Sequence, residues 1–316
     1  MTEEVAKRHV TATRPQSSFR GNIIHALKLA AASRSAWFYA GVWLASVLVL
    51  AVGGHDIPVA GIVVGLVLLL LSLLVVGATE PARAVRAVAG PARRRVWVQL
   101  GLVAVFIALT AWNNLAFHKV IDGNAEIPLW TPMVGWLRDL GEQWFGEGLG
   151  NFVANPVTYM LIPLIVLLLA GAHLPTLGFA RGHRAGRALL ICCALPVAWF
   201  AFTLVSGQRA IVRLLGAFAS DFMQNGFFEE FLFRGVLQTR LRLLAGPGWA
   251  LVLQALVFGV WHLGVGYTNT GHTGLLPAIA ITIVQQSLIG LALGILFERT
   301  RNLLVPSVVH IALNSM

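Results

Sequence analysis

The sequence predicts an all-α fold, a polytopic transmembrane helical bundle of about eight or nine spans. Of its 316 residues, 57% are hydrophobic and 11% are charged, whereas charged residues make up about a quarter of an ordinary soluble domain. Apolar runs long enough to cross a hydrocarbon core of roughly 30 Å recur along the chain. The basic residues fall between these runs and form no single patch, which is typical of membrane topology.

The chain begins with a basic segment, residues 1–36, that precedes the first apolar run. This length and these flanks do not fit a cleaved signal peptide, so we expect a cytoplasmic arm and then a retained anchor. Residues 37–174 are predicted to hold plain transmembrane spans, with an interfacial loop at about 113–155. Its mixture of Gly, Pro, Trp and acidic residues indicates short interfacial helices, with Trp130, Trp136 and Trp144 at headgroup level. The apolar runs of this half that no charge interrupts are 37–54, 57–78, 96–112 and 156–172.

The second half of the chain, residues 175–316, differs because its apolar runs contain ionisable or amide side chains. A charge near the centre of a span costs at least roughly 2.5 to 3.5 kcal/mol, so such residues are functional candidates by default. We therefore expect the chemistry in this half. Its apolar runs are 188–205, 222–239, 249–265, 275–297 and 303–316.

The net charge of +10 reflects topology and predicts no nucleic-acid partner, because basic and acidic loops alternate along the chain. If the N-terminal arm is cytoplasmic, the basic clusters at 83–95 and 299–301 lie inside, and the acidic residues of 113–155 lie outside. The bias toward Ala, Val, Arg and Gly is typical of bacteria. We expect an integral protein of the bacterial cell membrane in contact with the lipid bilayer. The sequence contains no pattern that indicates an oligomeric state.

Glu229 and Glu230 are consecutive acidic residues inside the run 222–239. Helical geometry separates neighbouring side chains by about 100° and places Arg234 one turn beyond Glu230. One carboxylate can therefore pair with Arg234 while the other stays free to act as a general base. The alternative is an ion pair of Glu230 with Arg234 that only fixes helix packing.

His262 and His310 are the two histidines, among nine, that fall within apolar runs. His310 and Asn314 share one helix face at i and i+4, and Phe258 lies one turn before His262. At about 1.5 Å per residue, Glu229, His262 and Asn314 all reach about 18 to 21 Å from the inner face. Three spans are thus predicted to bring polar groups to one layer, although a lone buried His is more often a packing residue.

These spans carry three motifs in order, namely Glu229-Glu230-x-x-x-Arg234, Phe258-x-x-x-His262 and His310-x-x-x-Asn314. The pattern resembles the CAAX protease and bacteriocin-processing family, also called the CPBP or Abi family, of intramembrane glutamic endopeptidases. The resemblance covers about the last third of the chain, from residue 204 onward. It implies that residues 175–316 form a protease core of this type.

The resemblance implies a peptide hydrolase that cleaves a membrane-associated protein or peptide with a glutamate-activated water and no covalent intermediate. Glu229 matches the catalytic base and would act with His262. His310 and Asn314 match the pair that would stabilise the oxyanion.

The remaining motif residues are given supporting roles by the resemblance. Glu230 and Arg234 would orient the base, and Phe258 would pack beside His262. No metal and no other cofactor is expected. Eukaryotic relatives trim prenylated tails, whereas peptide processing or membrane-protein cleavage is the expectation for a bacterial chain.

Three other functions stay open from the sequence. Glu229, His262 and His310 could bind zinc and leave a position for water, although no His-Glu-x-x-His sequence occurs. A proton-coupled transporter also uses intramembrane Glu and His but usually has internal repeats, which we do not detect. A non-catalytic immunity or scaffold protein of the same fold is the third. The sequence contains no Gly-x-Ser-Gly motif and no pair of Asp residues within its apolar runs, so it lacks the catalytic residues of serine and aspartyl intramembrane proteases.

Overall fold

The computed structural model describes residues 18–79, 91–121 and 125–316 of the chain. Of these residues, 82% are helical, and within them the β-structure is one isolated bridge between Phe179 and Asn302. The predicted all-α helical bundle is confirmed. Residues 1–17 of the arm 1–36 and residues 83–90 of the basic cluster 83–95 lie outside the described residues.

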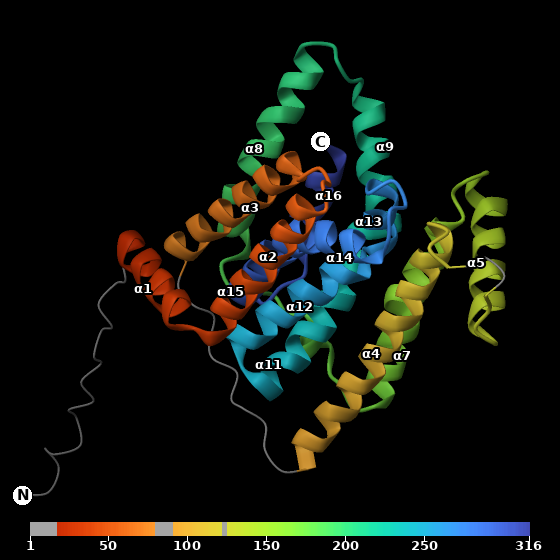
Figure 1. Cartoon of the computed structure of the whole chain (residues 1–316), viewed down its shortest axis with the longest axis horizontal. Coiled ribbons are helices and arrows are strands. Elements are labelled where there is room, and N and C mark those ends of the chain that lie inside the picture. The colour runs from red at the N-terminus through yellow and green to blue at the C-terminus, as the bar shows by residue number, and fades with distance from the viewer. Residues whose placement is uncertain (1–17, 80–90, 122–124) are drawn as a thin grey trace, which may run out of the picture.

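The first half of the chain forms two groups of helices that Figure 1 shows on opposite sides of the molecule. Helices α1 to α3 lie on one side, whereas α4 and α7 run together on the other side with α5 beyond them. The helices of this half are α1 (Phe19–Ala32), α2 (Arg34–Val52), α3 (Val59–Ala78), α4 (Pro91–Phe117), α5 (Trp130–Phe145), α6 (Asn151–Asn155), the π-helical η1 (Pro156–Leu161) and α7 (Ile162–Leu169).

The second half fills the space between these two groups (Figure 1). Its elements are the 3₁₀ turn η2 (Leu174–Leu177), α8 (Ala185–Val205), α9 (Ile211–Asp221), the π-helical η3 (Phe222–Gly226), α10 (Phe227–Glu230), the π-helical η4 (Phe231–Gln238), α11 (Thr239–Ala245), α12 (Pro247–Trp261), α13 (Leu263–Asn269), α14 (Leu275–Val284), α15 (Gln286–Thr300) and α16 (Leu304–Ser315).

Six of the described helices are long and apolar enough to cross a membrane, or seven if α12 and α13, which are bent by 53°, form one span. Our sequence-based number of eight or nine includes two more segments. One is the uninterrupted helical stretch 211–245, whose polar side chains lower its mean hydropathy. The other is α16, which has 12 residues.

The α14–α15 helix is the most enclosed span of the bundle. Of the span Leu275–Thr300, 67% is buried, compared with 17% of α2. α15 packs against α12 and α3, and α14 packs against α2. A Cβ atom on Gly290 of α15 would lie only 2.9 Å from the Phe258 ring of α12, so a small residue is needed where these helices cross.

The connection at 113–155 is largely helical. α4 continues to Phe117, and α5 is a 16-residue helix whose Trp136 and Trp144 side chains are 61% and 65% exposed. Trp130 at its start is instead buried, and its indole N–H donates to Asn113 Oδ1 at 2.9 Å.

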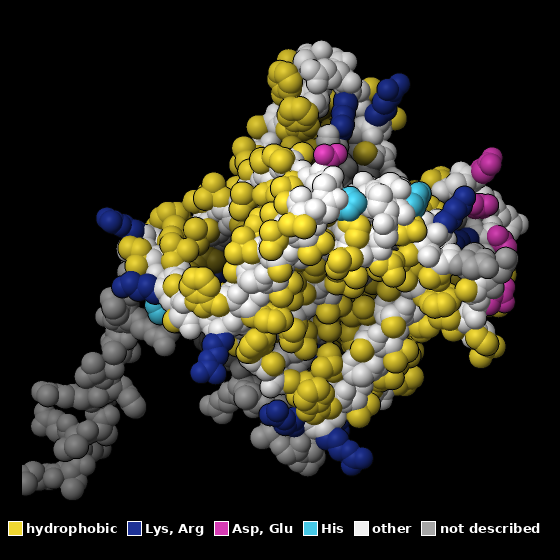
Figure 2. Space-filling view, viewed as in Figure 1, with side chains coloured by type: hydrophobic (Ala, Val, Ile, Leu, Met, Phe, Trp, Pro, Cys, Tyr) yellow, Lys and Arg dark blue, Asp and Glu magenta, His cyan; other side chains and the backbone are white. Residues whose placement is uncertain are grey.

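Hydrophobic side chains cover most of the face in Figure 2, as expected of a surface in contact with lipid. Lys and Arg side chains project from the lower end, with a few more at the upper end, whereas acidic side chains gather at the α5 side. The charges therefore lie mainly at the margins of the apolar face.

Candidate active site

The two acidic residues lie in the middle of the helical stretch 211–245, where the helix is locally widened. Segments η3 and η4 flank the single turn α10 and have π-helical geometry, which occurs frequently at functional sites. Gly226, at the end of η3, faces Ile311 of α16, and a Cβ atom there would collide with the Ile311 side chain. The glycine thus lets α16 approach the helix just before Glu229.

Glu230 is fully buried and makes two hydrogen bonds through one oxygen. Its Oε1 accepts from Arg234 Nη1 at 2.8 Å and from His310 Nδ1 at 2.9 Å. Arg234, also fully buried, further donates to the Gly290 carbonyl at 3.1 Å and lies 4.4 Å from the centre of the Phe258 ring. The ion pair with Arg234 therefore exists, and Glu230 holds His310 in addition.

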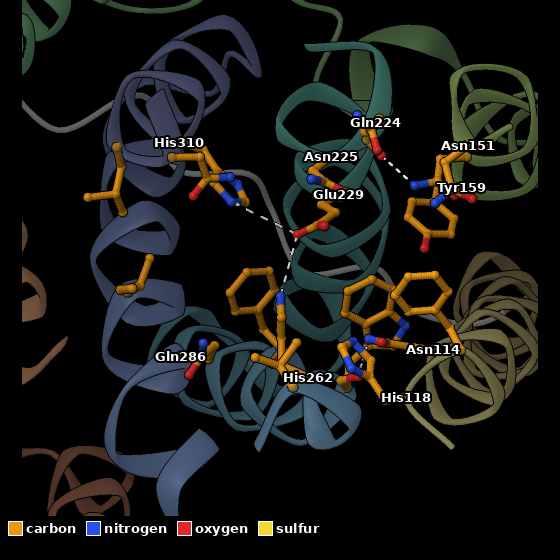
Figure 3. A pocket seen from close by; sticks show the side chains of 18 residues that line it. Asn114, His118, Asn151, Tyr159, Gln224, Asn225, Glu229, His262, Gln286 and His310 are labelled. Carbon is orange, nitrogen blue, oxygen red and sulfur yellow. Dashed lines mark hydrogen bonds and ion pairs between the residues drawn. The ribbon is translucent and has the colours of Figure 1, made fainter. Parts of the chain in front are cut away.

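Glu229 points the other way and faces two imidazoles. Its Oε2 lies 3.8 Å from His262 Nε2 and 4.0 Å from His310 Nε2 (Figure 3). The side chain is 6% exposed, and Oε2 receives no hydrogen bond from any group in the described ranges. Consecutive helix residues diverge by about 100°, and the Glu230 carboxylate contacts Arg234 and His310.

His262 lies at the break between α12 and α13. Its Nδ1 is 2.8 Å from the Phe258 carbonyl oxygen. A carbonyl only accepts hydrogen bonds, so Nδ1 carries the proton and Nε2 is left to face Glu229. The Phe258 ring packs against the imidazole, with 4.6 Å between the ring centres.

His310, on α16, is fixed in the same tautomer by a different partner. The carboxylate of Glu230, paired with Arg234, accepts from Nδ1, so Nδ1 carries the proton and Nε2 faces Glu229. Two buried imidazoles thus present the same nitrogen to one carboxylate oxygen.

Asn314 lies one turn after His310 and reaches the site beside Asp221. Its amide nitrogen donates to Asp221 Oδ1 at 2.9 Å, and the amide of Asn225 donates to the same oxygen at 3.4 Å. Asp221, Asn225 and Glu229 follow one another at intervals of four residues on one helical stretch. Asp221 is not among the predicted site residues, because it lies at the edge of the apolar run 222–239.

These side chains border a cavity of about 410 Å³ between the two halves of the chain. The sequence-based residues Glu229, His262, His310, Asn314 and Phe258 all line it, whereas Glu230 and Arg234 lie behind it. The other lining residues are Asn114, Phe117, His118, Asn151, Asn155, Tyr159, Gln224, Asn225, Trp261, Val265, Gln286, Ile289 and Leu313.

Sequence reasoning missed the part of this lining that comes from the first half of the chain. Asn114 and His118 extend from the end of α4, and Asn151, Asn155 and Tyr159 come from α6 and η1. The available signal was the polar spacing at i and i+4 beside apolar runs. His118 lies just beyond α4, and burial lowers the pKa of its imidazole.

Metal binding is one alternative that bears on this geometry. The described residues contain no group of three or more His, Cys, Asp and Glu side chains that could hold a metal ion. Glu229, His262 and His310 are the three residues that the zinc alternative would use as ligands. The Nδ1 atom of each imidazole contacts a protein oxygen, the Phe258 carbonyl for His262 and the Glu230 carboxylate for His310.

Comparison with known proteins gives a match for the part of the chain that carries this site. No curated protein matches the chain. No solved structure matches it either. Residues 211–316 match the family model described as type II CAAX prenyl endopeptidase Rce1-like. This segment contains Glu229, Glu230, His262, His310 and Asn314, so the resemblance to the CAAX protease family is confirmed over the C-terminal third of the chain.

Proposed function

We propose that this protein is an intramembrane endopeptidase that hydrolyses peptide bonds of a membrane-associated protein or peptide through a water activated by Glu229. The observation that carries the proposal is the convergence of Glu229 Oε2 with His262 Nε2 and His310 Nε2, at 3.8 and 4.0 Å, on a polar cavity. The match of residues 211–316 to an endopeptidase family supports the same activity.

The protonation of the two imidazoles supports the role of Glu229 as base. Neutral His262, with its proton on Nδ1, presents only a lone pair to the Glu229 carboxylate, whereas His310, which faces the Glu229 and Glu230 carboxylates, is proposed to carry a proton on each nitrogen. The distances of 3.8 and 4.0 Å exceed a direct hydrogen bond. A water molecule between these atoms donates its hydrogens to Glu229 and His262, which leaves its oxygen lone pair free to attack a carbonyl carbon.

The oxyanion formed by that attack is proposed to bind His310 and Asn314. When His310 carries a second proton, its Nε2–H donates toward the cavity while Nδ1–H stays on Glu230. The Asn314 amide uses one N–H on Asp221 and retains the other for the oxyanion. Donors held in place before reaction stabilise the developing charge without reorganising during it.

Collapse of the tetrahedral intermediate completes the reaction. The proton taken from water by Glu229 and His262 passes to the leaving amine nitrogen as the carbon–nitrogen bond breaks. The products are a carboxyl group and an amine, so one water is consumed and no covalent enzyme intermediate forms. Glu230 and Arg234 act as positioning residues for His310.

The test of the proposal is the substitution Glu229→Gln, which preserves the size of the side chain and removes the base. Cleavage should fall by about 10²- to 10⁴-fold, the usual contribution of general acid–base catalysis. The measurement compares new protein termini in membranes of cells that produce the wild type or the variant. Glu298→Gln is a matched control because Glu298 pairs with Arg242 and lies outside the cavity lining. If cells that produce Glu229→Gln form the same new termini as cells that produce the wild type, the proposal is refuted.

A further inference from the structure

The side of the cavity that the proposed reaction does not use is lined by carboxamides. We define the carboxamide wall as Asn114, Asn151, Asn155, Gln224 and Asn225. Figure 3 shows Asn114, Asn151 and Gln224 on the side of Glu229 away from His310, with Asn225 next to Glu229. They come from α4, α6 and η3, so both halves of the chain contribute.

The partners of these amides fix which of their atoms remain for a ligand. The Asn114 amide nitrogen donates to the Trp261 carbonyl at 3.2 Å, and that of Asn155 donates to the Gln224 carbonyl at 2.6 Å. Carbonyl oxygens only accept, so neither amide can be flipped. Each therefore retains its side-chain oxygen as an acceptor, with no partner among the described residues.

Asn225 and Asn151 complete the pattern with opposite polarity. Asn225 donates to the Asp221 carboxylate at 3.4 Å and so retains an acceptor oxygen. Asn151 Oδ1 accepts from Arg138 Nε at 3.3 Å. Because this guanidinium nitrogen only donates, the NH₂ group of Asn151 is the part left over. Asn114, Asn155 and Asn225 thus each offer an acceptor oxygen and the second N–H of the NH₂ group, and Asn151 offers both of its N–H groups. Gln224, whose amide nitrogen lies 2.8 Å from the Ser220 hydroxyl, completes the wall.

This pattern matches the needs of a peptide main chain that has left its helix. Every N–H and C=O of a transmembrane helix is paired within the helix, and unpaired groups are costly where water is scarce. A scissile carbonyl must nevertheless leave the helix to meet a nucleophile. The freed N–H groups need acceptors and the freed C=O groups need donors, which are the groups that the wall presents.

We propose that the carboxamide wall binds the main chain of an unwound peptide segment next to the scissile bond. This inference rests on the proposed function and adds the conformation of its substrate and the residues that select it. A cavity of about 410 Å³ lies within the range of sites that hold small ligands, so it accommodates a short stretch of peptide. Recognition of main-chain atoms leaves the wall indifferent to most side-chain identities.

The experiment measures binding and does not depend on hydrolysis. Full-length Glu229→Gln protein in nanodiscs is incubated with a pool of palmitoylated, fluorescent heptapeptides of randomised sequence, and the retained sequences are identified. The best-retained peptide is then remade as a series of esters, each replacing one main-chain N–H by oxygen. We expect at least one ester to bind about tenfold more weakly, the loss equivalent to 1.4 kcal/mol.

Substitutions in the wall then identify the acceptor that pairs with the replaced N–H. Asn155→Leu and Asn114→Leu keep approximate side-chain size and remove the acceptor. In the variant that lacks the contact, amide and ester should bind equally, because the pairwise coupling has gone. Asn269→Leu, on the exposed end of α13 and outside the cavity lining, is the control that should keep the tenfold ratio. A variant that merely disturbed folding would weaken amide and ester alike.

The possible outcomes separate the two proposals. Esters that all bind like the amide, retention of no peptide, or a ratio unchanged in every wall variant would each overturn the role of the wall. If the ester effect holds and wild-type protein leaves the same peptide intact, the wall stands and the endopeptidase proposal fails. If the wild type cleaves the peptide and its ester equally well, the endopeptidase proposal holds and the role of the wall is refuted.

Discussion

At the scale of single residues, the two adjacent glutamates have different surroundings. Glu230 is fully enclosed and bonded to Arg234 and His310, whereas Glu229 opens onto the cavity. The sequence motifs located both residues and both imidazoles. They did not assign their contacts, because the bond between Glu230 and His310 spans 80 residues and depends on which helices are neighbours.

The buried pair of Glu230 and Arg234 leads to a prediction on stability. Arg234→Met should lower the free energy of unfolding by about 3 to 5 kcal/mol, because Glu230 is left buried without its partner. The double variant Glu230→Gln with Arg234→Met should recover part of this loss. Denaturation in detergent micelles measures both. Arg242→Met, which breaks a more exposed pair with Glu298, should cost less than about 1 kcal/mol; equal losses in the two single variants would contradict the prediction.

At the scale of elements, the site is built where helices depart from regular geometry. Glu229 and Glu230 lie in one α-helical turn between two π-helical segments, and His262 lies at the 53° bend between α12 and α13. Sequence periodicity located the spans well, because their length is dictated by the bilayer. It assumes a constant rotation per residue, which π-helical segments and bends violate, so the directions of polar side chains could not be obtained in this way.

The crossing of α12 over the α14–α15 helix is predicted to fix the position of His262. A Cβ atom on Gly259 would lie 2.9 Å from Ser287 Cβ and 3.1 Å from the Thr282 carbonyl oxygen. Backbone atoms cannot move aside cheaply, so Gly259→Ala should cost about 1 to 3 kcal/mol and displace His262. Thermal unfolding and cleavage activity are the measurements.

Gly101→Ala provides the matched control for this crossing. Gly101 lies on an exposed face of α4 with no atom within 4 Å of its added Cβ. Alanine there should be neutral or stabilise the helix by up to about 1 kcal/mol. A Gly259→Ala protein as stable and as active as Gly101→Ala would show that the crossing tolerates a methyl group.

At the scale of the whole molecule, the two halves form one bundle around a shared cavity. We expected the chemistry to belong to the second half, and the motif residues do lie there. The opposite side of the cavity comes from α4, α6 and η1. The i and i+4 spacing of these polar residues was too unspecific to identify this contribution, because asparagine near a helix end is also an ordinary capping or interfacial residue.

Metal dependence is a property of the whole enzyme that separates the two hydrolytic mechanisms considered from the sequence. Prolonged dialysis against a strong chelator should leave cleavage unchanged, because the proposed nucleophile is activated by Glu229 and His262 alone. Loss of activity that is restored by added zinc would establish the metal mechanism instead.

The predicted orientation places the N-terminus and the basic loops in the cytoplasm. In a background with Cys192→Ala and Cys193→Ala, single cysteines at exposed loop positions report this topology. Glu147→Cys should react with a membrane-impermeant maleimide in intact cells. Arg181→Cys should react only after the cells are permeabilised, and labelling in the opposite order would invert the predicted topology.

The origin of the cavity walls has a consequence for how such proteins diversify. The segment that matches the endopeptidase family, residues 211–316, supplies the acidic residue and both imidazoles, while the polar residues of α4 and α6 arrive on a stretch of chain outside that match. The groups proposed to react and most of the amides proposed to hold the main chain therefore reside on different parts of the chain. A chimaera that receives α4 to α7 from a homologue lacking these amides should keep Glu229 and both imidazoles but grip an unwound polypeptide less tightly, whatever its side chains.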